Sequence, residues 1–188
     1  MANKIQNFDT GEKDNSNIIH LDLDPKINIE NKIYFKNLLK KIAECSLDNL
    51  EENLENLYHV DAEFNGFHPI NEIKGIEEIK NKYLIPLKKA FPDLERRNNL
   101  VIGGAFRDKV FVSFVSHLTG TFSNEWLGVK PTNKTIHLRT CEAHQITNNK
   151  IIKSYTLIDT VDFIRQAGHW PINKLSLIHI SEPTRLNP

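Results

Sequence analysis

Four polar or ionisable side chains cluster near the C-terminal end of the sequence: Glu142, His144, Tyr155 and Asp159. They fall in two segments, 135–147 and 150–160, that are predicted to be strands. Asn148 and Asn149 separate these segments, and because Asn tolerates positive φ they predict a two-residue hairpin turn. Pairing outward from this turn places all four side chains on one face, among apolar neighbours. Apolar walls with a few convergent polar groups are what a ligand pocket requires.

The elements that must position this face begin with helices. Apolar residues recur at helical spacing after residue 31, after a candidate N-cap at Ser46 and after Gly75. Pro86 is expected to bend or interrupt the third helix. Residues 58–75 contain turn dipeptides that break the helical period.

The strands come next. Besides the hairpin, strands are predicted at 99–104 and 109–120, and a last helical turn or two at 161–168. Arg96 and Arg97 are interpreted as a solvated strand start. This order of elements predicts an α+β fold, with three N-terminal helices packed on one face of a curled antiparallel sheet.

The composition is that of an ordinary globular domain. The chain has 188 residues, of which 39% are hydrophobic and 26% charged, and this suits one domain with tails. Basic and acidic residues balance at 24 each, and no long block of one sign indicates a nucleic-acid or membrane surface. There is no apolar run long enough to span a bilayer, and the start lacks the apolar region of a secretory signal. We expect a cytoplasmic protein that binds neither nucleic acid nor membrane.

Three parts are expected along the chain. Residues 1–30 are rich in Asn, Asp and Lys and are expected to form a flexible N-terminal arm. Residues 31–174 are expected to form the α+β domain. Residues 175–188 include LSLIHISEPTR, which back-translates into a sequence resembling a transposase-library adapter, so this tail is interpreted as an artefact.

Several separated motifs resemble those of the SnoaL-like polyketide cyclases, also called ester cyclases. In chain order they are HPINEIKGIEEI, PLKKAFPDLERR, GTFSNEWLGVKPTN, LRTCEAHQI and DFIRQAGHWP. The likeness runs from about His59 to Pro171. It implies a cone-shaped α+β barrel of the nuclear-transport-factor-two type, in which helices close a curled antiparallel sheet around a deep pocket.

The resemblance also implies a reaction. The best-known family members close a ring by intramolecular aldol condensation of a polyketide ester; an Asp moves a proton and a His helps polarise a carbonyl. These roles match Asp159 and His144. A proton next to a carbonyl is weakly acidic, so its carboxylate base works best when partial desolvation raises the base's pKa. The enolate needs a donor where its charge develops. The expected ligand is small, apolar and carbonyl-containing.

The central candidates each have a structural alternative. Asp159 could instead cap the helix that follows it. His144 could be a satisfied histidine of the sheet. Glu142 could pair with Arg139 or Lys153, or form a wall of the pocket.

Six residues are assigned to substrate binding: Glu142, Tyr155, His117, His68, Asn71 and Trp126. His117 either lines the pocket or faces solvent. His68 and Asn71 are loop-forming types and are expected to order a loop at the pocket mouth. Trp126 either anchors the long loop by packing or forms a platform for the substrate.

Metal and cofactor chemistry are not expected. No cluster of His, Cys, Asp or Glu has a spacing typical of a metal site, and no Gly-rich phosphate loop follows a strand. The alternative to an enzyme is a non-catalytic module that uses the same barrel to bind a small molecule or to dimerise, and so to form a homo-oligomer. The direction of Asp159 separates these functions. A carboxylate in the pocket beside His144 favours the enzyme, and one tied to backbone N–H groups of the last helix favours the module.

Overall fold

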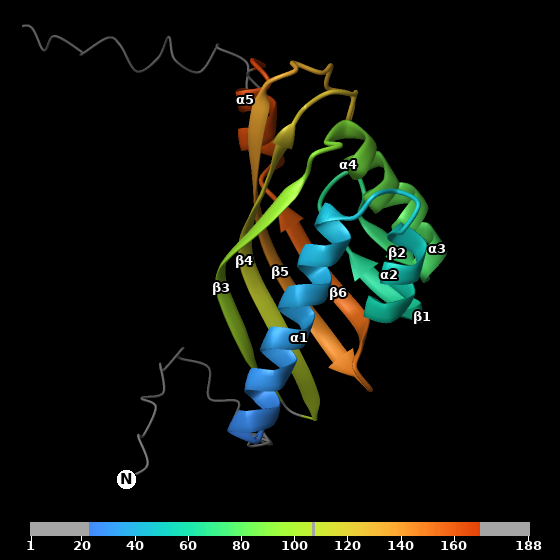
Figure 1. Ribbon diagram of the computed structural model, residues 1–188, viewed down its shortest axis with the longest axis vertical. Helices are drawn as coiled ribbons and strands as arrows, with labels where there is room; N and C mark the ends of the chain where they lie inside the picture. The colour runs from blue at the N-terminus through green and yellow to red at the C-terminus, as the bar shows by residue number, and fades with distance from the viewer. Residues whose placement is uncertain (1–22, 107, 170–188) are drawn as a thin grey trace, which may run out of the picture.

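A six-stranded sheet forms the body of the fold (Figure 1). The computed structural model describes residues 23–106 and 108–169. The order of the strands across the sheet is β2-β1-β6-β5-β4-β3, so β2 and β3 are its edges. Their bounds are β1 Tyr58–Asn65, β2 Glu72–Lys74, β3 Glu95–Phe106, β4 Lys109–Thr121, β5 Thr135–Thr147 and β6 Lys150–Ile158.

The sheet is mixed and does not close into a complete barrel. Strands β3 to β6 pair antiparallel in chain order, as do β1 and β2, but β1 pairs parallel with β6. The expectation of a purely antiparallel sheet is therefore wrong in this detail. Its source is the segment 58–75, where turn dipeptides hide the two short strands β1 and β2. The pairing of β1 with β6 brings the middle of the chain against its last strand.

Helices cover one face of this sheet, which makes the fold α+β as predicted (Figure 1). The long helix α1 crosses the sheet, while α2, α3 and α4 lie beside β1 and β2. No helix in the described ranges is long and apolar enough to cross a membrane. The helix bounds are α1 Pro25–Glu44, α2 Leu50–Leu57, α3 Ile76–Glu78, η1 Ile79–Leu84, α4 Ile85–Ala90 and α5 Thr160–Gln166.

Helix α1 begins six residues before the predicted start of the domain at residue 31. Asp24 caps it, because its carboxylate accepts a hydrogen bond of 2.7 Å from the backbone N–H of Lys26. Pro25 suits the first helical position, where no backbone N–H is needed. The helical spacing of apolar residues in the sequence does not reveal that α1 starts here, because the first turns of the helix expose Ile27 and Ile29 and bury few side chains.

The other two predicted helices also differ in detail. Helix α2 begins at Leu50 and not directly after Ser46, so Ser46 does not cap it. The third predicted helix is continuous through α3, η1 and α4. Pro86 lies in the first turn of α4, directly after the π-helical turn η1. In that turn the backbone hydrogen bonds span five residues and not four, since Ile85 N–H donates to Lys80 O. The helix therefore continues past Pro86 without a break.

The β5–β6 hairpin turns where the sequence predicts it. Asn148 and Asn149 have φ values of 50° and 58°, and Ile146 pairs with Ile151. Beyond this pair the register shifts, and Gln145 opposes Lys153. A shift of one residue turns a strand's side chains to the opposite face. The inner face of β6 is therefore made by Ile151, Ser154, Thr156 and Ile158.

An aromatic cluster fills one end of the core, beneath α5 and the loop after β4. The ring centroid of Trp126 lies 5.1 Å from that of Phe163 and 5.8 Å from that of Phe91. Phe91 and Phe122 stack at 5.2 Å. Such ring pairs stabilise the core beyond simple burial. This end is solidly packed, and the cavity described next lies elsewhere in the core.

Candidate active site

A small cavity lies between the helices and the inner face of the sheet. Its volume is about 30 Å³, enough for one or two water molecules. Most of its wall is apolar and comes from α1, α2 and the α3–α4 helix: Leu39, Ile42, Leu57, Leu84 and Leu87. Polar side chains converge on it from the sheet and from α4: Tyr58, Lys88, Arg96, Glu142, His144 and Thr156.

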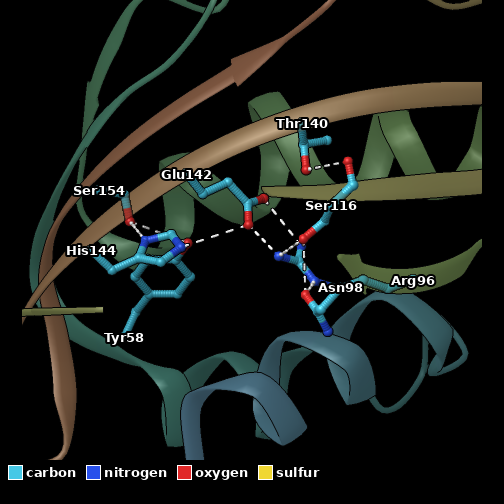
Figure 2. Close-up of polar contacts among 8 residues, drawn as sticks. All are labelled: Tyr58, Arg96, Asn98, Ser116, Thr140, Glu142, His144 and Ser154. Carbon is cyan, nitrogen blue, oxygen red and sulfur yellow. Dashed lines mark hydrogen bonds and ion pairs between the residues drawn. The ribbon is translucent and has the colours of Figure 1, made fainter. Parts of the chain in front are cut away.

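A buried ion pair joins β3 to β5 at this cavity (Figure 2). Arg96 donates from Nη1 to Oε1 of Glu142 at 3.1 Å and from Nη2 to Oε2 at still closer range. Its Nε donates to Asn98 Oδ1 at 2.9 Å, and Nη2 also donates to Ser116 Oγ at 3.1 Å. Two charges removed from water need this many hydrogen bonds to offset the cost of desolvation.

The Arg96–Glu142 pair keeps both groups charged. Burial alone would raise the pKa of the Glu142 carboxyl, but the charge of Arg96 and the nearby His144 ring outweigh it and hold this pKa at about 2. Burial opposes the charge on Arg96 as well, and Glu142 more than compensates, so the guanidinium pKa is raised. Glu142 is therefore an ionised carboxylate inside an apolar cavity at neutral pH.

His144 lies on the inner face of β5, two residues after Glu142. Its side chain is 1% exposed, and its Nδ1 is 2.9 Å from Ser154 Oγ on β6. Nε2 is buried and has no hydrogen-bond partner in the part of the chain that the structure describes. The nearest carboxylate oxygen, Glu142 Oε2, is 3.9 Å from it. Nε2 is thus available to a ligand.

Ser154 and Tyr58 extend the contacts of His144 (Figure 2). Ser154 is completely buried, and its Oγ donates to Tyr58 OH at 3.5 Å. Tyr58 begins β1, and the parallel pairing of β1 with β6 brings it there. Burial raises the pKa of Tyr58 to about 12, so its hydroxyl stays protonated at neutral pH.

The structure does not bring Asp159 and His144 together. Asp159 is the N-cap of α5, and its Oδ1 accepts a hydrogen bond of 2.9 Å from the backbone N–H of Asp162. Its Oδ2 lies 2.9 Å from Arg139 Nη2, on the outer side of the sheet. Asp159 and His144 do not share a face because the register shifts at Gln145. From there on, each residue of β5 opposes a residue of β6 one position later than predicted. Asp159 therefore takes the capping role that was its alternative interpretation.

The same shift displaces Tyr155, which is 46% exposed on the outer face of β6. His117 also faces outward from β4, where its Nδ1 is 2.8 Å from Asn99 Oδ1. Neither residue lines the cavity. The register shift turns Tyr155 away from the predicted face, and His117 takes the solvent-facing alternative of its two interpretations.

The loop residues lie away from the cavity too. His68 and Asn71 are exposed in the turn between β1 and β2, where the Asn71 side chain donates to Pro69 O at 3.1 Å. The Asn71 side chain thus bonds within this turn, and neither residue is among those that line the cavity. Trp126 belongs to the aromatic cluster and acts as a packing anchor for its loop. Of the eight predicted site residues, the cavity brings together Glu142 and His144.

The sequence does not predict that two cationic side chains, Arg96 and Lys88, are buried at the cavity. Arg96 is 5% exposed and not a solvated strand start. The signal for it is its spacing of two from Leu94, since alternate residues of a strand share a face. Lys88 donates to Ile42 O at 3.0 Å and to Ala43 O at 2.7 Å, and so satisfies the last carbonyls of α1. No local pattern indicates a lysine in that role.

Metal ligands do not gather at the cavity. Within residues 23–106 and 108–169 there is no group of three or more His, Cys, Asp or Glu side chains that could hold a metal ion. The polar groups that line the cavity are instead the Arg96–Glu142 ion pair, the His144 imidazole, the Lys88 ammonium and the hydroxyls of Tyr58 and Thr156. This set can bind a polar atom of a ligand and exchange a proton with it.

Solved structures identify the class of fold. The chain is similar to AclR of Streptomyces galilaeus, with a TM-score of 0.62 and 19% identity over 82% of this chain and 91% of that one. It is also similar to a nuclear transport factor 2-like superfamily protein of Salmonella enterica, with a TM-score of 0.55 and 14% identity over 70% and 89%. Both likenesses concern the fold, which is that of the nuclear-transport-factor-2-like proteins.

The family follows from the sequence itself. A model of the SnoaL-like polyketide cyclases matches residues 36–167, and the chain belongs to this family. A SnoaL-like polyketide cyclase of Agrobacterium tumefaciens shares the fold, with a TM-score of 0.57 and 13% identity over 72% of this chain and 96% of that one. No curated protein matches the sequence.

Proposed function

We propose that this chain is a SnoaL-like cyclase or isomerase that transfers a proton at a carbon next to a carbonyl, without a cofactor. The observation that carries the proposal is the Nε2 atom of His144. It is buried and unpartnered among the described residues, and it lies beside an ionised carboxylate in a cavity with apolar walls. Family membership and the apolar walls support a small, apolar carbonyl-containing substrate.

In this proposal His144 is the proton carrier. A neutral imidazole accepts a proton on Nε2 and becomes a cation, and the Glu142 carboxylate at 3.9 Å stabilises that cation. The apolar surroundings strengthen this attraction relative to water. Glu142 itself is a poor base, because the ion pair with Arg96 holds its pKa near 2.

The proposed reaction is an aldol-type ring closure of a polyketide-like ester. His144 removes a proton from the carbon next to the ester carbonyl, and the resulting enolate carbon attacks a second carbonyl of the same molecule. A carbon–carbon bond forms, the electron pair of that second carbonyl moves to its oxygen, and the imidazolium returns the proton there. An isomerase would use the same first step and return the proton to a different carbon.

The cavity must widen for this reaction. Its volume of about 30 Å³ is far below the 300–1,000 Å³ typical of ligand pockets. The walls that can move are apolar side chains of α1 and of the α3–α4 helix. Two hydrogen bonds also hold the ends of α1 to β3, from the Asn28 side chain to Gly103 O and from the Arg96 backbone N–H to Glu44. We expect substrate binding to displace this helical wall while the ion pair on the sheet stays in place.

A second candidate is a non-catalytic binding module. The observation that favours it is Asp159, whose carboxylate is tied to the backbone of α5. If the site only binds, its buried polar groups would orient a ligand carbonyl and move no proton. The two candidates differ in one measurable property, which is exchange of the ligand's proton with solvent.

The test is deuterium exchange from D₂O into a panel of β-keto esters at the carbon next to the ester. The parent protein should catalyse exchange, and His144→Ala should reduce the rate roughly 10²–10⁴-fold, the usual contribution of a positioned base. Added imidazole should restore part of the rate, because the variant leaves room for it. His117→Ala is the matched control, since this histidine lies on the outer face, and it should exchange like the parent.

Unchanged exchange in folded His144→Ala would overturn the assigned role. Binding of an ester by the parent without any exchange would instead establish the module. Circular dichroism of each variant separates loss of the base from loss of the fold, and His144→Gln provides a second variant of closer size.

A further inference from the structure

The single proton of the Ser154 hydroxyl determines which ring nitrogen of His144 carries hydrogen. Ser154 Oγ has two neighbours, His144 Nδ1 at 2.9 Å and Tyr58 OH at 3.5 Å (Figure 2). Ser154 can donate to only one of them. If it donates to Tyr58, its oxygen must accept from Nδ1–H, and Nε2 then holds the lone pair.

The opposite arrangement leaves a buried donor without an acceptor. If Ser154 donated to Nδ1, the ring proton would sit on Nε2, whose nearest carboxylate oxygen is 3.9 Å away and outside hydrogen-bond range. A buried N–H without an acceptor is costly, whereas the first arrangement places the unpaired donor on the Tyr58 O–H, where a ligand oxygen can accept it. The attraction of Glu142 for that proton is also reduced, because Arg96 already contacts both of its oxygens.

The preferred arrangement also frees the proton of Tyr58. Its oxygen accepts from Ser154, and no acceptor for its own O–H is found in the described part of the chain. The side chain is buried and lines the cavity beside His144. An O–H at this position can donate to the oxygen of a ligand in the cavity.

We infer that Tyr58 is the second catalytic residue of this site: it donates to the substrate carbonyl oxygen, while Ser154 holds His144 with Nε2 as the proton acceptor. The inference rests on the proposed function. As the proton leaves carbon, negative charge grows on the carbonyl oxygen, and a preorganised donor stabilises that charge. Ser154 contacts both the base, His144, and the donor, Tyr58, and it acts as a positioning residue for the two.

Tyr58→Phe tests the donor. The ring and its packing remain, so the fold should persist, but the hydroxyl is lost. Deuterium exchange should slow by about 10²–10³-fold, the usual cost of removing one such donor, with a much smaller change in KM. Tyr155→Phe is the matched control on the exposed face of β6, and its exchange should stay within twofold of the parent.

Ser154→Ala tests the positioning role by a spectroscopic readout. ¹⁵N NMR distinguishes the two tautomers of a neutral imidazole, and the His144 signal is assigned by its loss in His144→Gln. The parent without ligand should show hydrogen on Nδ1. In Ser154→Ala the Nδ1–H population should fall, and exchange should slow together with a changed pH profile, which packing alone would not alter.

Two results would overturn the inference. One is a parent whose neutral His144 ring carries its hydrogen on Nε2. The other is a Tyr58→Phe protein that exchanges as fast as an active parent. Failure of the proposed function looks different, because the parent itself would then exchange no deuterium.

Discussion

The charge inside the cavity depends on two residues, Arg96 and Glu142. Each compensates the other, and their side chains are only 4% and 5% exposed. Removing one partner of a buried pair leaves the other charge uncompensated. The protein then loses more stability than the intact pair contributes to it. The pair therefore serves the site by holding a negative charge near His144, and it makes the fold dependent on both partners.

Glu142→Gln should destabilise the protein by about 3–5 kcal/mol, because the Arg96 charge is left buried. Urea unfolding measures this change. Glu95→Gln is the matched control, since Glu95 is exposed and forms a surface pair of 3.6 Å with Arg97. Its effect should be within about 0.5 kcal/mol. Equal effects of the two substitutions would contradict the burial argument.

Stability should also fall with acid in a defined window. The pKa of Glu142 is about 2 in the folded protein and 4.5 ordinarily, so the folded state favours the ionised form. Its contribution is complete above pH 4.5 and is lost as the pH falls towards 2. The loss is on the order of 3 kcal/mol. The stability difference between parent and Glu142→Gln should shrink over this range, and a constant difference would refute the assignment.

At the scale of elements, α1 depends on a close approach to β3. The Asn28 side chain donates to Gly103 O at 2.9 Å. A Cβ on Gly103 would overlap Asn28 Oδ1 and lie 2.9 Å from Lys32 Cγ. Glycine is needed here because helix and strand leave no space for a side chain. Contacts in the N-terminal half of α1 therefore hold in place the part of the cavity wall that this helix provides.

Gly103→Ala should destabilise the protein by about 1–3 kcal/mol, the usual cost of overpacking. Gly104→Ala is a neighbouring control, because nothing lies within 4 Å of a Cβ at that position. It should be neutral within about 0.5 kcal/mol. Thermal or urea unfolding of both variants gives the comparison, and equal stability of the two would mean that α1 does not approach β3 as described.

Elements with a strong period are predictable from the sequence, and elements set by tertiary contacts are not. Strands β4 and β5 and the turn at Asn148 and Asn149 follow from alternation and turn chemistry. Glu142 and His144 share the inner face of β5 because they lie before the register shift. The shift itself comes from the fit of β6 into the curled sheet, and no local pattern marks Ile152 as its extra residue. The misassignment of Asp159 follows from this single residue.

At the scale of the whole molecule, the outer face of the sheet carries a row of apolar side chains that crosses four strands. Leu100, Val115, Cys141 and Leu157 are directly opposed across β3, β4, β5 and β6. Leu157 is 63% exposed and Leu100 50%. Large contiguous apolar patches are typical of interaction sites. We propose that two copies of the chain associate through this row to form a homo-oligomer.

Leu157→Lys should weaken self-association, because it places a charge in the middle of the apolar row. Sedimentation velocity should show the parent as an oligomer and the variant shifted towards monomer by at least tenfold in Kd. Val60→Lys, another exposed apolar position but on β1, should leave the oligomer unchanged. A monomeric parent at high concentration would contradict this prediction.

In the proposed function the proton acceptor is His144 in the cavity and not Asp159 at the start of α5. The most direct test compares deuterium exchange into a β-keto ester by the parent, His144→Gln and Asp159→Asn. Asn retains helix capping, so Asp159→Asn should fold and exchange at the parent rate. His144→Gln should be slower by roughly 10²–10⁴-fold. The reverse result, with Asp159→Asn slow and His144→Gln unaffected, would contradict the assignment.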